Sequence, residues 1–356
     1  MERNNFLYQE DLDKILQNQL EWDLLDHKAV LITGATGMVG TFLVDVLMKR
    51  NKVWGSKIQV YAMSRSIQKL KTVFKRYQDE KCFHMIEQDI TAPFTDFKEK
   101  IDYAIHAASN THPIEYASDP IGTITSNLFG IYNLLEYAKN VKTCRIVVLS
   151  SVEIYGECSY ETEWFDEKSC GYLDCNTLRS GYPESKRLSE SLLQAYIAQE
   201  GVDGVVIRLC RLFGATMNLD DSKAVSQFIL DAVNKRDIVL KSDGNQYYSY
   251  LYVADAVSAI LYVMLWGKCG EAYNAATDKA NVHLKEIANY LANMVNRKVI
   301  YDIPEKVEQA GYSKATKALL NAHKLEQLGW QAVYSAKEGL RRTVVILGEE
   351  ACSDKD

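Results

Sequence analysis

The chain has 356 residues, 47% of them hydrophobic, and can bury a large core as one domain or as two lobes that share a cleft. Its formal net charge of −6 argues against a nucleic-acid partner, because phosphate contacts need clustered lysine and arginine. The sequence has no apolar run of the ~20 residues that cross a bilayer and no signal-peptide core, so we expect a cytoplasmic protein without a membrane partner.

The cysteines give no sign of a disulfide framework or of a metal site. No two form a Cys-x-x-Cys pair, and no group of histidines and cysteines has the spacing of zinc ligands. We therefore expect free thiols and no bound metal. The eight cysteines are Cys82, Cys144, Cys158, Cys170, Cys175, Cys210, Cys269 and Cys352.

Residues 1–27 form a polar N-terminal extension. Over 9–25 apolar residues recur among charges at roughly helical spacing, which predicts an amphipathic helix. From residue 28 short apolar runs alternate with helical patterns, which predicts an α/β fold with a doubly wound, Rossmann-like parallel sheet. The expected strands are 28–34, 57–63, 82–90, 101–108, 144–151 and 204–209, and the expected helices include 38–50, 66–79, 120–139 and 182–200.

After about residue 212 the pattern becomes irregular. We assign 28–212 to the Rossmann-like domain, with 250–280 returning to it, and 213–350 mainly to a smaller C-terminal substrate lobe. In that lobe we expect helices at 222–234, 253–266, 283–295 and 335–348, and short strands near 237–240 and 298–302.

The first expected strand leads into a glycine-rich turn. Gly34, Gly37 and Gly40 follow it and open a helix. The first glycine permits a tight turn, the second lets backbone approach a pyrophosphate, and the third permits close packing of helix on strand. The helix N-terminus adds free N–H groups and a positive dipole end. This context favours a dinucleotide site over an ordinary glycine-rich turn.

The end of the second expected strand selects the cofactor. An acidic residue there would bond the ribose of NAD, but the chain has Ser64 and Arg65. Arg65 could pair with the extra phosphate of NADP, or it could be a solvated surface arginine. Asp89 and Ile90, after the third strand, are expected beside the adenine. The cofactor is therefore NAD or NADP.

Two segments carry residues for hydroxyl chemistry. Ser151 ends the strand 144–151, and Tyr182 and Lys186 open the helix 182–200 on one face. The lysine ammonium and a positively charged nicotinamide would lower the tyrosine pKa from about 10 toward working pH. We expect Tyr182 to take a hydroxyl proton, with Ser151 bonded to the same oxygen, while hydride leaves for the nicotinamide.

Together these motifs resemble the extended short-chain dehydrogenases of the nucleotide-sugar epimerase/dehydratase group, over about residues 28–348. Within this group the chain most resembles the UDP-glucuronate decarboxylases. The stretches that carry the resemblance are HAASNTHPIEYASDPIGTITSN (106–127), SVEIYGE (151–157), RSGYPESKRLSE (179–190) and LDDSKAVSQFILDAV (219–233), with LGWQAVYSAKEGLRRT (328–343) typical of the wider group.

The resemblance implies a nucleotide-sugar substrate, NAD as the expected cofactor, and roles for further residues. Glu153 falls where decarboxylases and 4,6-dehydratases keep a functional glutamate, so it joins Ser151, Tyr182 and Lys186 in the catalytic set. The residues expected to bind substrate are Arg179, Arg211 and Tyr248. Besides Tyr182 and Lys186, the cofactor contacts are expected from Gly34, Thr36, Gly37, Met38, Val39, Ser64, Arg65, Asp89, Ile90, Ala107, Ala108 and Ser109.

Several positions depart from the pattern of the group. Val152 replaces the aspartate with which dehydratases donate a proton. Tyr248 stands where the group has an arginine that contacts phosphates or a sugar carboxylate, Arg211 stands where asparagine is usual, and residues 214–216 read Gly-Ala-Thr instead of Gly-Pro-Arg. One interpretation is that Arg211 supplies the lost charge from another position. The alternatives are that the pocket binds something else or that activity has been lost.

We expect transient oxidation at sugar carbon 4, followed by decarboxylation or 4-epimerisation of a UDP-linked hexuronate. The alternatives are 4,6-dehydration of a dTDP- or UDP-linked sugar, against which Val152 argues, and reduction of a keto sugar. A rival from another class is a non-catalytic nucleotide-binding regulator that kept the fold, because fold alone does not fix function.

The helices 120–139 and 182–200 carry apolar residues over more than one narrow stripe. Related enzymes pair these two helices with their symmetry mates in a four-helix bundle, so the resemblance implies a homodimer. The alternative is that the stripes are used wholly inside one subunit. The apolar residues are Ile121, Ile124, Leu128, Ile131, Leu134 and Leu135 in the first helix and Leu188, Leu192, Leu193, Tyr196 and Ile197 in the second.

Overall fold

The computed structural model describes residues 4–95, 97–110, 116, 118–157, 163–302 and 315–353. Its centre is a seven-stranded sheet in the order β10-β6-β5-β4-β1-β2-β3, in which all neighbouring strands are parallel. This sheet confirms the predicted doubly wound α/β fold. Its strands are β1 (Ala29–Thr33), β2 (Gln59–Ser64), β3 (Phe83–Glu87), β4 (Tyr103–His106), β5 (Arg145–Ser151), β6 (Gly204–Leu209) and β10 (Ala272–Ala275).

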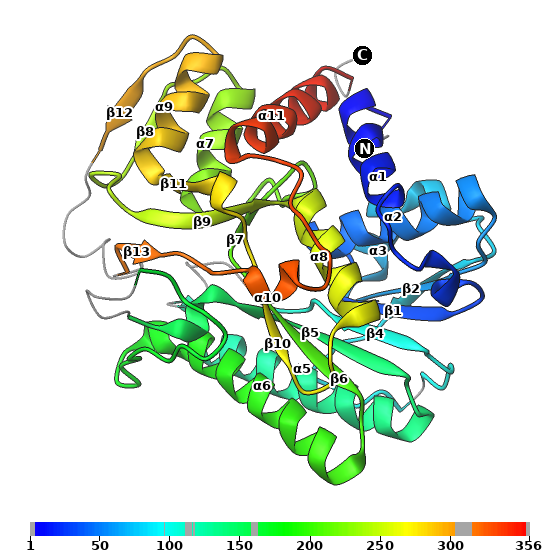
Figure 1. The fold of residues 1–356 in the computed structure, drawn as a ribbon. Coiled ribbons are helices and arrows are strands. Elements are labelled where there is room, and N and C mark those ends of the chain that lie inside the picture. Colours follow the sequence, from blue (N-terminus) through cyan, green and yellow to red (C-terminus); the bar gives the residue numbers. More distant parts are fainter. Residues whose placement is uncertain are drawn as a thin grey trace.

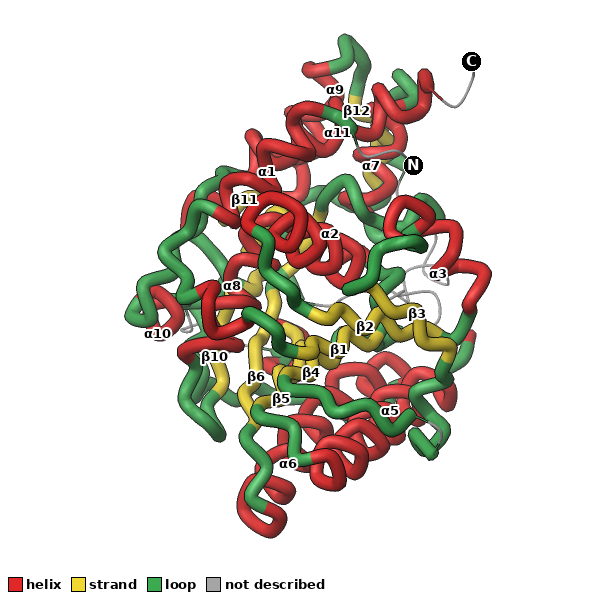
Figure 2. Tube along the Cα trace, turned by 90° about the vertical axis from the view of Figure 1, so that its right-hand side faces the viewer, coloured by secondary structure: helices red, strands yellow, loops and turns green. Residues whose placement is uncertain are grey.

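Helices cover both faces of this sheet (Figure 2). On one face lie α2 (Met38–Trp54), α3 (Ile67–Val73) and α8 (Val253–Trp266), and on the other lie α5 (Pro120–Val141) and α6 (Gly181–Glu200). Successive residues of β5 supply the two cores in turn: Val147 faces the first set of helices and Val148 the second. A strand buried on both faces needs apolar residues at every position, which explains the continuous apolar runs in the sequence.

A smaller lobe packs at the carboxyl end of the large sheet, and it is the upper part of Figure 1. Its sheet has β9 (Tyr247–Tyr252) paired in parallel with β7 (Arg211–Phe213) and β13 (Lys317–Ala318), and antiparallel with β11 (Asn281–His283). A separate parallel pair joins β8 (Ile238–Leu240) to β12 (Val299–Tyr301). The lobe contains the helices α7 (Ala224–Val233), α9 (Leu284–Met294) and α11 (Ala336–Ser353), whereas the short helix α10 (His323–Glu326) lies against β10 of the large sheet.

The N-terminal extension differs from its prediction. The expected single helix over 9–25 is α1 (Phe6–Leu16), followed by a turn and the short 3-10 helix η1 (Trp22–Leu25). The turn after α1 leaves Trp22 and Leu25 of η1 buried in the main core. Asp11 of α1 is fully buried and accepts hydrogen bonds from Tyr252 and Tyr334 at 2.6 Å each, so α1 is tied to β9 and to the chain before α11.

Most predicted elements of the large sheet and its helices are present within a few residues of their expected bounds. The strands β7, β9, β11 and β13 of the small lobe and β10 of the large sheet were not predicted. These strands are short. Each pairs with a segment far away in the sequence or lacks a clear alternation of apolar and polar residues. Within the described ranges, none of the helices has the length and apolar character needed to cross a membrane.

Candidate active site

The glycine turn between β1 and α2 has the shape that a pyrophosphate requires. Gly34 has a φ of +66°, and a Cβ there would lie 2.7 Å from the Cα of Ala108; a Cβ on Gly40 would lie 2.5 Å from the Gly34 carbonyl oxygen. Gly37 caps α2, and no described side chain takes up the free N–H groups of this helix end. These groups and the helix dipole suit a phosphate, so the turn fits a dinucleotide cofactor.

The other predicted cofactor residues surround this turn to different degrees. Thr36 lies beside Ser64 at the end of β2, with their hydroxyl oxygens 3.3 Å apart. Ala107 and Ala108, after β4, line the other side of the turn, where their backbone atoms approach Gly34. Met38 and Val39 form the first turn of α2, and Arg65 is exposed at the start of the loop that follows β2.

Asp89 and Ile90 lie after β3, on the same edge of the sheet. Asp89 is exposed and accepts hydrogen bonds from the amide and the hydroxyl of Thr91. The carbonyl of Ile90 accepts a hydrogen bond of 2.9 Å from Asn133 of α5. Both residues are therefore held in place by the protein, and their contact with adenine stays a prediction.

The serine, tyrosine and lysine of the predicted catalytic set come together where β5 ends and α6 begins. The hydroxyl of Tyr182 hydrogen-bonds with the side chains of Ser151 and Ser109. Ser151 also accepts the amide hydrogen of Glu153 at 3.2 Å. Lys186 lies one helical turn after the tyrosine, where its Nζ is 6.0 Å from the centre of the Tyr182 ring and donates to the Leu149 carbonyl at 3.0 Å.

The pKa of Tyr182 is raised in the protein by itself, whereas the expected lowering includes the positive charge of a bound nicotinamide and stays a prediction. Burial raises this pKa to about 12; hydrogen bonding with Ser151 and Ser109 opposes the rise, and the negative charge of Glu153 adds to it. Burial also lowers the pKa of Lys186 to about 8, against the effect of Glu190. The lysine ammonium therefore titrates near working pH, whereas the tyrosine needs further positive charge to ionise there.

A chain of polar side chains holds Tyr182 in place, and sequence reasoning missed most of it. Ser109 donates to Asn127 of α5 at 2.8 Å, and Asn127 donates to Ser185 of α6 at 2.8 Å. Ser185 in turn donates to the main-chain oxygen of Tyr182 at 2.8 Å. The only signal in the sequence was that Asn127 and Ser185 stand inside the stretches that carry the family resemblance.

Tyr116 was also missed. Its ring stacks on the ring of Tyr182, with centres 4.7 Å apart and an angle of 16° between the planes. The guanidinium of Arg179 lies 5.7 Å from the centre of the Tyr116 ring. Tyr116 belongs to the stretch 106–127, of which residues 111–115 and 117 lie outside the described residues.

The predicted substrate residues form one cluster with Glu153. Arg179, just before α6, donates to one carboxylate oxygen of Glu153 at 3.0 Å, and the other oxygen lies 3.5 Å from Nη2 of Arg211. The guanidinium of Arg211 stacks on the ring of Tyr248, 3.5 Å from its centre. Three elements that are separate in the sequence (the segment after β5, the segment just before α6 and strand β7) thus supply one charged group beside Tyr182.

The tertiary structure also places a residue that sequence reasoning did not single out for a contact. The hydroxyl of Thr216, in the Gly-Ala-Thr segment 214–216, donates to the carbonyl of Met38 at 2.8 Å. This bond ties the small lobe to the first turn of α2. Among the described residues, no group of three or more histidines, cysteines or acidic side chains could hold a metal ion.

Comparison with known proteins identifies related sequences over most of the chain. The family model described as the NAD dependent epimerase/dehydratase family matches residues 30–276. UDP-glucuronic acid decarboxylase 1 of Danio rerio is 29% identical over 328 residues, which cover 91% of this chain and 74% of that protein. UDP-glucuronic acid decarboxylase 6 of Arabidopsis thaliana is 30% identical over 315 residues, or 87% of this chain and 86% of that protein.

Solved structures share the fold over nearly the whole chain. An epimerase from Methanothermobacter thermautotrophicus superposes with a TM-score of 0.80 at 21% identity, covering 98% of each chain. UDP-glucuronic acid 4-epimerase from Bacillus cereus, in complex with UDP-glucuronic acid and NAD, superposes with a TM-score of 0.77 at 19% identity, covering 90% of this chain and 99% of that one.

Proposed function

The chain belongs to the NAD-dependent epimerase/dehydratase family, and from that premise we propose that it acts on a UDP-linked hexuronate, which it oxidises at carbon 4 and then decarboxylates or epimerises. The observation that carries the proposal is the arrangement of Tyr182, Ser151 and Lys186 next to the glycine turn. The resemblance to decarboxylases of UDP-glucuronic acid over 87–91% of the chain supports the choice of substrate.

In the first step the sugar hydroxyl on carbon 4 loses its proton to the oxygen of Tyr182. The Ser151 oxygen accepts a hydrogen bond from the Glu153 amide, so its proton can be given to Tyr182 or, when substrate is bound, to the substrate oxygen. Bound NAD would supply the hydride acceptor and later return the hydride. Lys186, as ammonium below its pKa of about 8, stabilises the negative charge of the tyrosinate through the field inside the buried site.

The second step distinguishes the candidate reactions. A carbon-4 ketone next to a carboxyl-bearing carbon lets CO2 leave with its bonding electrons delocalised into the ketone as an enolate, which is then protonated. Epimerisation needs only that the keto sugar turn over before hydride returns. Water elimination needs an acid, and Val152 is buried and cannot donate a proton. We therefore place decarboxylation or 4-epimerisation ahead of dehydration, with Glu153 as the acid–base group that protonates the enolate if the second step is decarboxylation.

The test is incubation of the purified protein with NAD and, separately, UDP-glucuronate, UDP-glucose, dTDP-glucose and a 4-keto sugar nucleotide, with products identified by mass spectrometry. We expect UDP-glucuronate to give either a product lighter by about 44 Da, which is the mass of the lost CO2, or an isomer of equal mass. A product ~18 Da lighter from dTDP-glucose would indicate a dehydratase instead. Binding of nucleotide sugars without any turnover would support the non-catalytic regulator.

We also propose that the protein is a homodimer. α5 and α6 lie side by side on the outer face of the sheet, and Ile131, Leu134 and Leu193 are buried against that sheet. Ile121 of α5 is nevertheless 74% exposed and Leu188 of α6 is 46% exposed. A second copy of the same two helices would cover these side chains across a two-fold axis, as the family resemblance implies.

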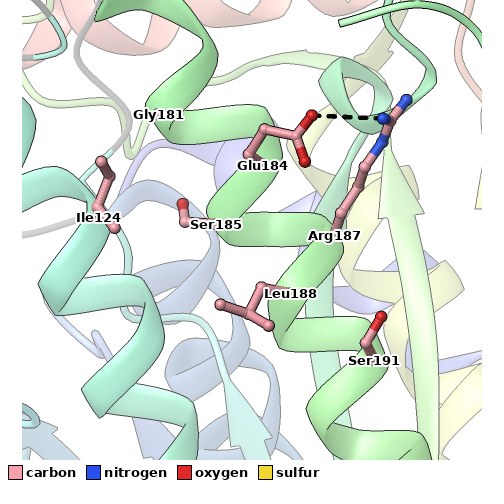
Figure 3. Close-up of a pocket in the computed structure, with 7 residues that line it drawn as sticks. All are labelled: Ile124, Gly181, Glu184, Ser185, Arg187, Leu188 and Ser191. Carbon is pink, nitrogen blue, oxygen red and sulfur yellow. Dashed lines mark hydrogen bonds and ion pairs between the residues drawn. The ribbon is translucent and has the colours of Figure 1, made fainter. Parts of the chain in front are cut away.

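Between the two helices runs a shallow groove of about 420 Å³ (Figure 3). Ile124 and Leu188 line it from α5 and α6, and the ion pair between Glu184 and Arg187, 3.4 Å long, stands at its edge. An apolar floor with a charged rim is the composition of a protein–protein contact. The groove therefore supports a second copy of this chain as its occupant.

A cytoplasmic location remains part of the proposal. Six cysteines in the described ranges are free thiols, four of them exposed, and free thiols persist in a reducing compartment. Cell fractionation with an antibody to the protein tests this location.

A further inference from the structure

The structure places Arg211 against the ring of Tyr248, a contact that the sequence alone did not predict. Arg211 is the first residue of β7, which pairs with β9, and β9 carries Tyr248. The guanidinium lies 3.5 Å from the centre of the buried Tyr248 ring, and the tyrosine hydroxyl donates to the carbonyl of Ala315 at 2.5 Å. The Tyr248 ring is therefore fixed at its hydroxyl by this hydrogen bond and at its other end by the backbone of β9. Stacking on this ring holds the guanidinium of Arg211 in one plane.

The hydrogen-bonding capacity of Arg211 is largely unused. Its Nη1 is buried and has no hydrogen-bond partner among the described residues. Its Nη2 lies 3.5 Å from the Glu153 carboxylate, whereas Arg179 makes the closer contact to that carboxylate, at 3.0 Å. A buried guanidinium N–H without an acceptor is costly, so the site is built for an additional acceptor. Two arginines and one glutamate also leave the cluster with a formal charge of +1, which suits a single anionic group.

The position of the cluster indicates which anionic group this is. From the ring of Tyr182, contacts run through Tyr116 to Arg179, then to Glu153 and to Arg211. The carboxylate beside Arg211 is also close enough to Tyr182 for its charge to act on that hydroxyl, so we infer that an anion on Arg211 lies on the side of the sugar whose hydroxyl meets Tyr182. In a hexuronate the carboxylate is on carbon 5, next to carbon 4, whereas the diphosphate is on carbon 1, across the ring.

We propose that Arg211, supported by the ring of Tyr248, binds the sugar carboxylate and makes the enzyme select uronates over neutral hexoses. This inference rests on the proposed function. It also accounts for two departures in the sequence, because the arginine that the family resemblance places at position 248 in β9 is replaced by an arginine at position 211 in the paired strand β7. Guanidinium–carboxylate pairs with two parallel N–H donors provide the specificity that such a choice needs.

The experiment uses calorimetry to measure the Kd of three ligands, UDP-glucuronate, UDP-glucose and UDP, in the presence of NADH, which cannot accept hydride from the sugar and so prevents turnover. The wild-type protein should bind UDP-glucuronate more tightly than UDP-glucose. In Arg211→Gln the Kd for UDP-glucuronate should rise about 10- to 100-fold, the size of a lost charged hydrogen bond, while the Kd values for UDP-glucose and UDP stay within about twofold. Arg236→Gln, at an exposed arginine of the small lobe paired with Asp231, is the matched control and should change none of the three.

The possible failures are distinct. If the Kd for UDP rises as much as the Kd for UDP-glucuronate in Arg211→Gln, then Arg211 binds the diphosphate. If Arg211→Gln keeps the wild-type preference for UDP-glucuronate, then Arg211 binds neither group. Both results overturn the inference and leave the proposed function standing. No preference in the wild type overturns both. NAD binding, measured in each variant, reports folding. The double variant Arg211→Asn/Tyr248→Arg places the charge on β9 instead, and it should regain the preference that Arg211→Asn alone loses.

Discussion

The ammonium of Lys186 donates a 3.0 Å hydrogen bond to the main-chain oxygen of Leu149 in β5. This bond fixes α6 against the sheet one helical turn after Tyr182. The same bond holds the lysine in a fully buried position, and this burial is the main reason for its pKa of about 8. Tyr182 and Lys186 are thus oriented by the carboxyl end of a central strand, where parallel sheets bind their ligands.

The first prediction concerns pH. If protonated Lys186 stabilises tyrosinate, kcat/KM should fall as pH rises through about 8, because the folded-state pKa of this lysine is lowered to that value by burial. Glu190 raises the pKa of Lys186, so Glu190→Gln should move the alkaline fall to lower pH. Initial rates between pH 6 and 10, with protein stability checked at each pH, measure both effects. A fall at the same pH in wild type and variant would remove Glu190 from this role.

Glu153→Gln tests the second step. Glutamine keeps the shape of the side chain and can still accept hydrogen bonds from Arg179, but it cannot take up or give a proton. We expect the variant to reduce bound nicotinamide, seen by its absorbance, while release of the final product slows by about 100-fold, a common size for lost acid–base catalysis. Equal rates for both steps in variant and wild type would show that Glu153 only pairs the two arginines.

Arg65→Ala tests cofactor choice. Arg65 is exposed beside Ser64, whose hydroxyl lies next to the glycine turn. If its guanidinium can pair with an additional ribose phosphate, its removal should weaken NADP binding by roughly 1–3 kcal/mol and leave NAD nearly unchanged. Fluorescence titration with both cofactors measures the difference. Equal losses, or none, would mean that Arg65 does not contact that phosphate.

Light scattering at micromolar concentration tests assembly. The dimer predicts twice the single-chain mass of 40.4 kDa. Ile124→Arg places a charge in the groove between α5 and α6 and should shift the mass toward one chain, because a buried unpaired charge is costly at an interface. Ile300→Arg, at an exposed isoleucine of β12 in the small lobe, is the control and should leave the dimer intact. A wild-type mass near 40.4 kDa would contradict the dimer.

Sequence periodicity was enough to predict the large sheet because its strands are buried on both faces and its helices have wide apolar stripes. β9 was harder to predict: five of its six residues are buried, three of them tyrosines whose hydroxyls would mark a surface strand. β10 has four residues and joins the sheet beside β6, far earlier in the chain. Such pairings depend on the tertiary fold and leave little local signal.

The candidate site shows the same division. The glycine turn and the pair Tyr182 and Lys186 are local patterns, so their spacing predicted them. The contacts of Glu153 with Arg179 and Arg211 join three separate elements, and the position of Arg211 is set by the pairing of β7 with β9. The pKa of Tyr182 could not be read from the sequence either, because burial outweighs the hydrogen bonds that oppose it.

The most direct test of the account is turnover of UDP-glucuronate by the wild type and by Tyr182→Phe, with NAD binding measured in both. Phenylalanine keeps the ring that stacks on Tyr116 and removes only the oxygen bonded to Ser151 and Ser109. We predict a decarboxylated or epimerised product from the wild type and a loss of about 100-fold or more in the variant, with NAD binding unchanged. Near-normal turnover by Tyr182→Phe would contradict the assignment of Tyr182 as the base on which the proposed chemistry depends.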